Sequence, residues 1–482
     1  MKTVHKIDPE KEYAAAKALI ELASKQVLDK DNASNLDQSV DNLITAARIL
    51  MEREELRRGK PKGPPTENAP KGRKKGEERA ESSKLPSQRY IDLEIVETKV
   101  KPDITPICSC CGSQMKESGL FDTTEKLEVK PKVYFISRLK RIKYNCKCSG
   151  TMVNTPAIAS IVPTSNYGDS FIIDVAMSKF CDLIPIERYV QIAFRAGVDG
   201  LPPQSLIGVT HHLANFLNPV YELIKKEVQS AEVLMADETT WRMLEGDETS
   251  QWYLWGFFSK IACYFESHDT RSGDVATTFL LDSHAKYLMS DGYSGYSKAL
   301  GILREKGRFI TETHCNAHAY RYFEEASQVW KDECKPFLQK YGDIYELERQ
   351  GASRDKLTAI FEQIKADCEK LQTSVMPGSA LLKAINYFLN HYDGLTECCT
   401  NKDIPLDNNL AERQIRSPVV GKKTWYGTHS KRGALTTAVM FSIVQSCKLN
   451  NINPRKYVAW VVEQIHQGKP PQTPFQYLHL HG

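Results

Sequence analysis

The sequence predicts a multidomain α+β protein in which helical segments and a small cysteine-containing module precede a mixed-sheet domain. The chain has 482 residues, 41% of them hydrophobic and 26% charged, which is long enough for several domains with separate cores. From Val233 onwards strand-like runs alternate with helical patterns, and the runs are V-L-M-A-D, W-Y-L-W-G-F-F, I-A-C-Y-F-E and Y-L-M-S-D. Residues 319–395 then have amphipathic helical spacing.

These patterns divide the chain into six segments. They are a helical, leucine-zipper-like region (1–56), a basic flexible linker (57–96), a zinc-finger-like module (97–155), a helical, helix-turn-helix-like segment (156–230), the mixed-sheet domain (231–442) with a helical insertion at about 320–403, and a C-terminal helical tail (443–482).

The first two segments differ sharply in composition. Apolar residues spaced 4, 3, 4 and 3 apart from Leu36 to Leu50 predict a helical seam, which fits either self-association or a plain helical hairpin. From Arg57 to Arg79, nine Lys/Arg and three Glu leave a charge of +6, with four prolines, four glycines and one hydrophobic residue. Such a segment cannot bury a core, so we expect a flexible linker that either only spaces the domains or also contacts phosphates.

The overall charge and hydropathy exclude some classes of protein. Net charge is +4, so any affinity for nucleic acid must come from local basic patches. No run reaches the roughly 18 apolar residues of a transmembrane helix, and M-K-T-V-H-K-I-D-P-E lacks the apolar core of a signal peptide. We therefore expect a soluble, intracellular protein whose close cysteine pairs indicate metal binding and not disulfides.

Two cysteine pairs flank a stretch with strand-like alternation. Apolar residues alternate with charged residues and one tyrosine from Leu127 to Phe135, which predicts strands around Pro131. A hairpin there would bring the pairs together as a structural Zn²⁺ site without an open position for water. The four predicted ligands are Cys108, Cys111, Cys146 and Cys148, and the basic face for DNA includes Lys140, Arg141 and Lys143. Alternatively the cysteines only pack, and Cys110 leaves the choice of ligands open.

A helix-turn-helix candidate spans residues 184–217. The second helix is predicted to turn an apolar face inward, and its outward side chains could reach base edges. The inward residues are predicted to be Leu206, Val209, Leu213 and Phe216. The outward residues are predicted to be Gln204, Ser205, Thr210 and His211. An ordinary helical hairpin explains the same pattern.

Three acidic residues lie where a mixed sheet would bring them together. Asp237 ends V-L-M-A-D, Asp291 ends Y-L-M-S-D, and Glu412 follows Asp407 and Asn408, either of which can cap a helix. Three converging carboxylates repel one another unless cations hold them, and oxygen-only ligation favours Mg²⁺ or Mn²⁺. Two such ions activate a water or a 3′ hydroxyl for phosphodiester chemistry. The alternative is that Glu412 and Arg416 form an ordinary i,i+4 pair on a helix surface.

The residues around Glu412 are basic and aromatic. Cations at this place are explained by a polyanionic substrate, and an aromatic ring can stack on an unpaired base. The predicted phosphate contacts are Arg413, Arg416, Lys422 and Lys423, with Trp425 or Tyr426 as the stacking residue.

At these motifs the sequence resembles the DDE transposases of bacterial insertion sequence 66. M-A-D-E-T-T-W resembles the family's first-aspartate motif, D-G-Y-S-G-Y its second, and D-N-N-L-A-E-R-Q-I-R-S-P-V-V-G-K-K its glutamate motif. C-N-A-H-A-Y-R-Y-F is similar to the family's Cys-x-x-His element, which would place Cys315 and His318 near the catalytic sheet. The cysteine pairs resemble its zinc-finger module, although the second pair is one residue tighter than the family's C-x-x-C.

The resemblance implies an RNase H-like catalytic domain with Asp237, Asp291 and Glu412 as its catalytic residues. It implies Mg²⁺-dependent (or Mn²⁺-dependent) nicking at the ends of the element and attack of the freed 3′ hydroxyls on target DNA. We expect a homo-oligomer, at least a dimer on double-stranded DNA, with accessory proteins encoded by the element, in the bacterial cytoplasm at the nucleoid. The alternatives are a non-catalytic DNA-binding subunit or repressor acting on element ends, and a structure-selective nuclease.

Overall fold

The structure is a computed structural model, and it describes residues 85–91, 93–98, 109–110, 113–114, 124–128, 132–145, 152–244 and 251–481. Within these residues the chain forms two compact units. The larger comprises residues 139–194 and 199–481, and the smaller comprises residues 85–138 and 195–198. The predicted helical region 1–56, residues 57–84 of the linker and all four predicted zinc ligands lie outside the described residues.

The smaller unit contains α3 (Pro86–Arg89) and extended chain. The backbone N–H and the hydroxyl of Ser87 donate to the two carboxylate oxygens of Glu125, over 2.8 and 2.9 Å. The strands predicted around Pro131 are wrong, because residues 124–128 and 132–142 have no regular structure. Val133 and Phe135 are 77% and 80% exposed, so the alternating side chains have no core to cover. The strands lie further along, where β1 (Lys143–Asn145) pairs antiparallel with β2 (Met152–Asn154) in the larger unit.

Four helices follow, as the sequence pattern predicts. They are α4 (Asp169–Phe180), α5 (Ile186–Arg195), α6 (Pro203–Phe216) and α7 (Asn218–Gln229). Leu206, Val209 and Leu213 are buried as expected. The prediction that Thr210 and His211 project outward is wrong. Because α6 packs against both α4 and α16 (Lys431–Leu449), Thr210 is 1% exposed, and His211 Nδ1 lies 2.7 Å from the Thr436 hydroxyl of α16.

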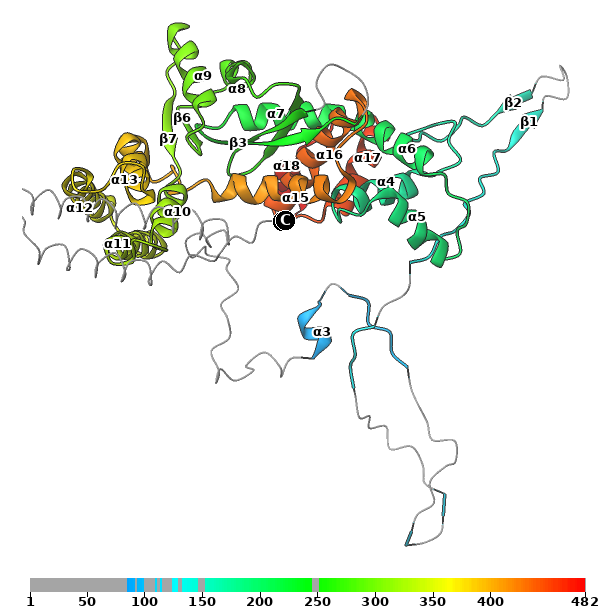
Figure 1. Ribbon diagram of the computed structural model, residues 1–482. Helices are drawn as coiled ribbons and strands as arrows, with labels where there is room; N and C mark the ends of the chain where they lie inside the picture. Colours follow the sequence, from blue (N-terminus) through cyan, green and yellow to red (C-terminus); the bar gives the residue numbers. More distant parts are fainter. Residues whose placement is uncertain are drawn as a thin grey trace, which may run out of the picture. The chain divides into compact units, whose positions relative to one another are not determined.

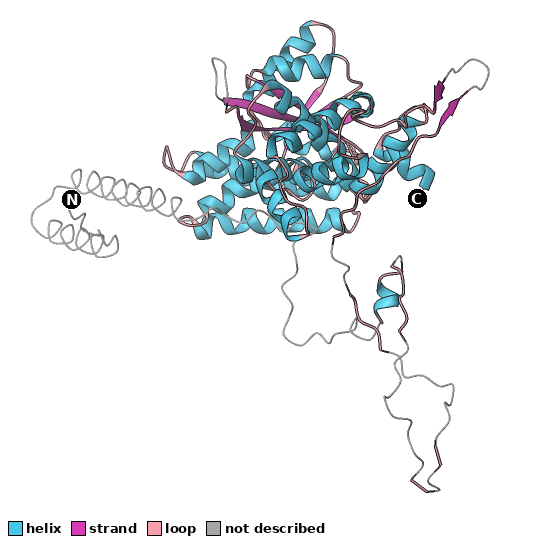
Figure 2. Cartoon of the chain, turned by 90° about the vertical axis from the view of Figure 1, so that its right-hand side faces the viewer, coloured by secondary structure: helices cyan, strands magenta, loops and turns pink. Residues whose placement is uncertain are grey.

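A mixed five-stranded sheet forms the centre of the larger unit. Its strands are β3 (Val233–Arg242), β4 (Gln251–Phe258), β5 (Cys263–His268), β6 (Tyr287–Ser290) and β7 (Thr311–His314). The order is β5-β4-β3-β6-β7. Strand β4 is antiparallel to both β3 and β5, whereas β6 and β7 run parallel to β3. Helices α8 (Gly273–Leu281) and α9 (Ser294–Glu305) connect β5 to β6 and β6 to β7, and helices flank the sheet (Figure 1, Figure 2).

Helix α16 packs against β5, the strand at one edge of the sheet. The hydroxyls of Ser442 and Ser446 accept hydrogen bonds from the backbone N–H groups of Phe265 and Cys263, each over 2.9 Å. These bonds satisfy donors that an unpaired edge would expose. Helices α17 (Pro454–His466) and α18 (Pro474–His481) complete the C-terminal part, and both pack against α16.

Between β7 and the glutamate helix the chain is helical, as the amphipathic spacing predicts. This stretch comprises α10 (Asn316–Ala326), α11 (Lys331–Arg349), α12 (Arg354–Gln372), α13 (Ala380–Asn390), α14 (Tyr392–Thr396) and the 3₁₀ helix η1 (Glu397–Cys399). The chain then returns to the sheet through α15 (Asn409–Trp425) (Figure 1). Among the described residues no helix combines the length and the apolar character that crossing a membrane requires.

Candidate active site

Asp237 and Asp291 occupy matching positions on neighbouring parallel strands. The register pairs Met235 of β3 with Met289 of β6, and each aspartate lies two residues further on. Adjacent strands are roughly 4.8 Å apart, so this register brings the two residues side by side where β6 ends. One expectation needs correction: β3 does not end at Asp237 but continues to Arg242, because these residues pair with β4.

The environment of Asp237 favours its neutral form. Burial, followed by the negative charges of Glu238, Asp291 and Glu412, raises the pKa of Asp237 well above its ordinary value. Glu238 has its own partners, since one carboxylate oxygen accepts from the Arg271 guanidinium and the other from the Tyr296 hydroxyl over 2.6 Å. Asp237 accepts only the N–H of the next residue, over 2.9 Å, among the bonds that the described residues show.

The turn after β6 depends on glycine. Asp291 accepts a hydrogen bond from the backbone N–H of Tyr293 over 2.9 Å, which folds the chain back on the aspartate. Gly292 between them has φ +87°, in the left-handed region that favours glycine. The D-G-Y sequence therefore fixes where Asp291 lies.

Glu412 comes from the first turn of α15, which Asn408 joins to β3. The Asn408 side-chain amide donates to the carbonyl oxygen of Ala236, the residue before Asp237, over 3.1 Å. The backbone N–H of Asn408 donates to the Cys315 sulfur over 3.2 Å. Asn408 occupies the N-cap position without a capping side-chain bond, whereas Asp407 accepts from the Asn409 N–H over 3.0 Å. Three chain segments thus meet at one point, beside the two aspartates.

Helix α10 supplies the immediate neighbours of Glu412. Arg321 Nη2 donates to Glu412 Oε2 over 2.8 Å, and His318 Nδ1 lies 3.9 Å from Glu412 Oε1. The sulfur of Cys315, a ring nitrogen of His318 and a carboxylate oxygen of Glu412 all lie within 4.8 Å of one another. The structure therefore places Cys315 and His318 beside Glu412. The sequence interpretation missed Arg321, although it stands three residues after His318 and so on the same helix face.

The residues present fit divalent cations. Burial and the nearby negative charges, including those of Asp291 and Glu412, disfavour the anionic form of Asp237. A cation bound among the three carboxylates would instead favour the anionic form. Glu412 Oε1 is buried and has no hydrogen-bond partner among the described residues, so this oxygen is free to accept a cation. Carboxylate oxygens are ligands that Mg²⁺ and Mn²⁺ prefer.

The chain is similar to known proteins over most of its length. A family model described as "Transposase IS66 family" matches residues 164–436, which is more than half of the chain and includes all three acids. The chain belongs to the transposase IS66 family. It is also similar to uncharacterized proteins of Sinorhizobium fredii (strain NBRC 101917 / NGR234). Protein y4hP is 26% identical over 78% of this chain and 73% of its own length, and protein y4jD is 26% identical over 75% of each chain.

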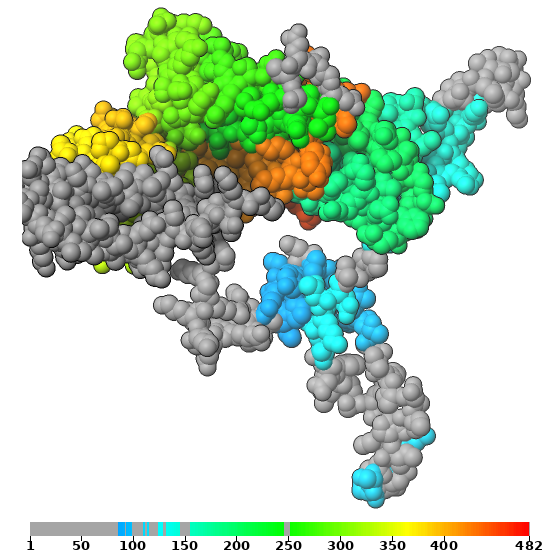
Figure 3. All heavy atoms as spheres, viewed as in Figure 1, coloured from blue at the N-terminus to red at the C-terminus, as the bar shows by residue number. Residues whose placement is uncertain are grey.

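In this IS66-family transposase, the basic residues after Glu412 divide into two groups. Arg413, Arg416 and Lys423 are exposed at intervals of three and seven along α15, so they share one helix face. Figure 3 shows α15 in orange at the surface of the larger unit. Lys422 instead turns to β3, where its Nζ donates to the Thr240 carbonyl oxygen over 2.6 Å. The first group is exposed to solvent, whereas Lys422 is half-buried.

The two aromatic residues at the end of α15 differ in the same way. Trp425 packs edge-to-face on Phe180, with Lys179 Nζ 4.4 Å above its ring, so the indole is occupied by helix packing. Tyr426 ends the helix in a left-handed conformation, with φ +66°, and is 69% exposed. Of these two rings, Tyr426 is the one that a base could reach.

The remaining predicted DNA contacts lie away from α15 in the sequence. Lys140, Arg141 and Lys143 are exposed, and Lys143 begins β1. Cys146 and Cys148 belong to the connection between β1 and β2, outside the described residues.

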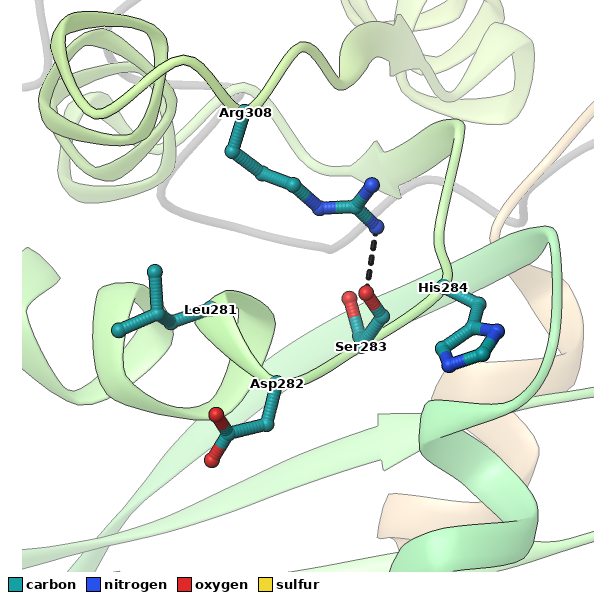
Figure 4. A pocket seen from close by; sticks show the side chains of 5 residues that line it. All are labelled: Leu281, Asp282, Ser283, His284 and Arg308. Carbon is teal, nitrogen blue, oxygen red and sulfur yellow. Dashed lines mark hydrogen bonds between the residues drawn. The ribbon is translucent and has the colours of Figure 1, made fainter.

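A polar hollow of about 490 Å³ lies elsewhere, lined by Leu281, Asp282, Ser283, His284 and Arg308 (Figure 4). The Arg308 guanidinium donates to the carbonyl oxygens of Ser283 and Ala285, over 2.5 and 2.9 Å. Its cation therefore holds the chain between α8 and β6, and the hollow includes none of the three acids.

Proposed function

We propose that this chain is a DNA transposase that binds the ends of an insertion sequence, cleaves a strand there and transfers the 3′ hydroxyl into target DNA. One observation carries the proposal: the register of β3 on β6 pairs the strands that carry Asp237 and Asp291, and the Asn408 side chain holds the start of α15, which carries Glu412, against β3. The strand order, with an antiparallel trio extended by two parallel strands, supports an RNase H-like catalytic domain.

Asp237, Asp291 and Glu412 would hold two Mg²⁺ or Mn²⁺ ions. When bound, these ions supply activation of a water or a 3′ hydroxyl and stabilisation of the leaving oxygen of a phosphodiester. The protein's own contribution is positioning. The β3–β6 register sets the two aspartates, Gly292 permits the turn behind Asp291, and Asn408 fixes the start of α15 against β3.

DNA contacts are proposed on two surfaces. The exposed face of α15 offers Arg413, Arg416 and Lys423 to phosphates beside Glu412, and Tyr426 to an unpaired base. A second surface would use the cationic residues before and within β1 together with a structural Zn²⁺ on the four cysteines. We further propose the six-segment division given above, an oligomer on DNA that pairs two element ends, accessory proteins from the same element, and a place at the bacterial nucleoid.

The test is divalent-cation-dependent nicking of a labelled duplex that carries the element's own terminal repeat. Wild type should nick at the repeat, Glu412→Gln should lose nicking by a factor of roughly 10³ or more while retaining binding, and Glu346→Gln should behave as wild type. Glu346 is a suitable control because it is a helix glutamate paired with an arginine, as Glu412 is, but it is exposed and lies on α11. Binding without nicking by wild type would identify a DNA-binding subunit, and nicking of unrelated duplexes at the same rate would identify a nuclease.

A further inference from the structure

Two side chains of α10 lie against the carboxylate of Glu412, and one of them, Arg321, donates a hydrogen bond to it. Arg321 and His318 are three residues apart, so they lie on one face of the helix. Arg321 Nη2 donates to Glu412 Oε2 over 2.8 Å, and its Nη1 lies 3.3 Å from His318 Nε2. One guanidinium therefore contacts both of the other groups.

The guanidinium determines which nitrogen of His318 carries a proton. Arginine has donors only, so His318 Nε2 must be the acceptor in this contact, and the neutral ring then carries its proton on Nδ1. That Nδ1 lies 3.9 Å from Glu412 Oε1. Both atoms are buried, and neither has another hydrogen-bond partner among the described residues. The Nδ1–H group thus faces the second oxygen of the carboxylate, at a distance that a small rotation or one water molecule closes.

A transition-metal site on Cys315, His318 and Glu412 is the competing interpretation, since their ligand atoms lie within 4.8 Å of one another. Zinc on His318 Nδ1 would require the proton to move to Nε2. The N–H at Nε2 would then face an N–H of the Arg321 guanidinium, and two hydrogen-bond donors in contact repel each other. The hydrogen bonds therefore favour a clamp on Glu412 over a metal site.

We propose that Arg321 is a positioning residue that, together with His318, fixes the orientation of the Glu412 carboxylate. Arg321 holds Oε2, so the rotation of the carboxylate is restricted. Oε1 has two lone pairs, of which one faces the His318 Nδ1–H and the other is left for a cation. The role of these contacts in metal binding rests on the proposed function. The contacts of Arg321 and His318 with the Glu412 carboxylate, which we call the clamp, can be measured without DNA or metal. Partners of this kind, which orient a ligand without touching the metal, typically change metal affinity 10- to 100-fold.

The first experiment is a double-mutant cycle in chelator on the full chain. We would measure the Tm of four proteins, which are wild type, Arg321→Gln, Glu412→Gln and the double variant. The loss in Tm of the double variant should be smaller than the sum of the two single losses, because both remove the same contact. The exposed pair Arg349 and Glu346 of α11 provides the matched cycle, which should be close to additive because exposed pairs contribute little. Additive losses for Arg321 and Glu412 would overturn the clamp.

The second experiment titrates Mn²⁺ into the metal-free full chain. Arg321→Gln should weaken Mn²⁺ binding by roughly 10- to 100-fold, Arg321→Lys should recover part of it, and Arg349→Gln should match wild type. Tighter binding by Arg321→Gln would overturn the proposal, because Arg321 would then be a cation that competes with the metal. If Asp237→Asn leaves Mn²⁺ binding unchanged, the proposed catalytic site fails, while the cycle still decides the clamp.

The third experiment separates the clamp from a zinc site. Cys315→Ser should bind as much Zn²⁺ per chain as Cys334→Ser, which removes a buried cysteine of α11 instead. Loss of one zinc in Cys315→Ser and also in His318→Gln would overturn the clamp in favour of the metal.

Discussion

The side-chain amide of Asn408 donates a hydrogen bond to the carbonyl oxygen of Ala236, which joins the start of α15 to the strand residue that precedes Asp237. Asn408 is 1% exposed and Ala236 is fully buried, so water cannot replace this bond. This side-chain amide therefore helps to set the orientation of the glutamate helix relative to the first aspartate, together with Lys422, which joins the other end of α15 to β3.

Asn408→Ala should destabilise the protein by about 1–3 kcal/mol, because the Ala236 carbonyl would be left buried without this donor. We also expect weaker Mn²⁺ binding, since α15 carries Glu412. Urea unfolding and Mn²⁺ titration measure the two effects. Asn386→Ala is the control, because Asn386 accepts one exposed hydrogen bond from Gln372. Equal stability of the two variants would show that the bond to β3 contributes little.

Stability in chelator should depend on the ionisation of Asp237. Burial and neighbouring negative charges raise its pKa, so the folded protein retains a proton that the unfolded chain, with a pKa of about 3.9, has lost. The contribution of Asp237 to the free energy of unfolding therefore falls as pH rises from about 4 through the raised pKa of the folded state. Above that range we expect Asp237→Asn to be more stable than wild type.

Urea unfolding at successive pH values tests this dependence. Burial also raises the pKa of Glu227 to about 7, but both proteins share that group, so the difference between them isolates Asp237. Asp282→Asn, at an exposed position, should follow the wild-type curve. Parallel curves for wild type and Asp237→Asn would mean that neither burial nor the neighbouring carboxylates raise the pKa of Asp237 in the folded protein.

Two glycine-to-alanine substitutions should have opposite effects. Gly292 has φ +87° with no atom closer than 3.5 Å to an added Cβ, so alanine there should cost about 1–3 kcal/mol through backbone strain alone. Gly301 lies inside α9 with open space around it, and alanine there should stabilise by about 0.4–1 kcal/mol. Tm values compare the two. Nicking should fall only in Gly292→Ala, and a harmless substitution there would show that the turn tolerates another backbone.

The exposed face of α15 should contribute to DNA affinity independently of sequence. Replacing Arg413, Arg416 or Lys423 by Gln should weaken binding to any duplex and lower the slope of log affinity against log salt by about 1 each. Lys356→Gln, on an exposed position of α12, is the control. An unchanged salt slope in all three variants would place the DNA elsewhere.

The mixed sheet and the helices could be predicted because their signals are local. The runs before Asp237 and Asp291 are apolar and bounded, and the helical spacing after residue 319 is regular. The prediction of strands around Pro131 was wrong because an alternating pattern also occurs in segments that do not pair with other strands. Phe135 in this segment is 80% exposed. Thr210 was misplaced because one apolar stripe does not reveal that α16 covers a second side of α6.

The contacts that complete the candidate site could not be predicted in the same way. Arg321 and Glu412 are 91 residues apart, and Asn408 and Ala236 are 172 apart. Neither pair leaves a periodic signal, because each contact depends on the path of the whole helical insertion. In the sequence, Arg321 also cannot be distinguished from an ordinary arginine on a helix surface, because its partner is distant.

The distance in sequence between Ala236 and Asn408 also sets an order in time. A ribosome adds roughly 5 to 20 residues per second, so the 172 residues between these partners take roughly 9 to 34 s to make. Once Asp291 has been added, the nascent chain has both aspartates, but it has no Asn408 to hold α15 on β3 and no Glu412 until the insertion has been made. On the proposed function, a nascent chain that has not yet reached Glu412 is unable to cut DNA, and truncated products that end within the insertion lack cleavage activity.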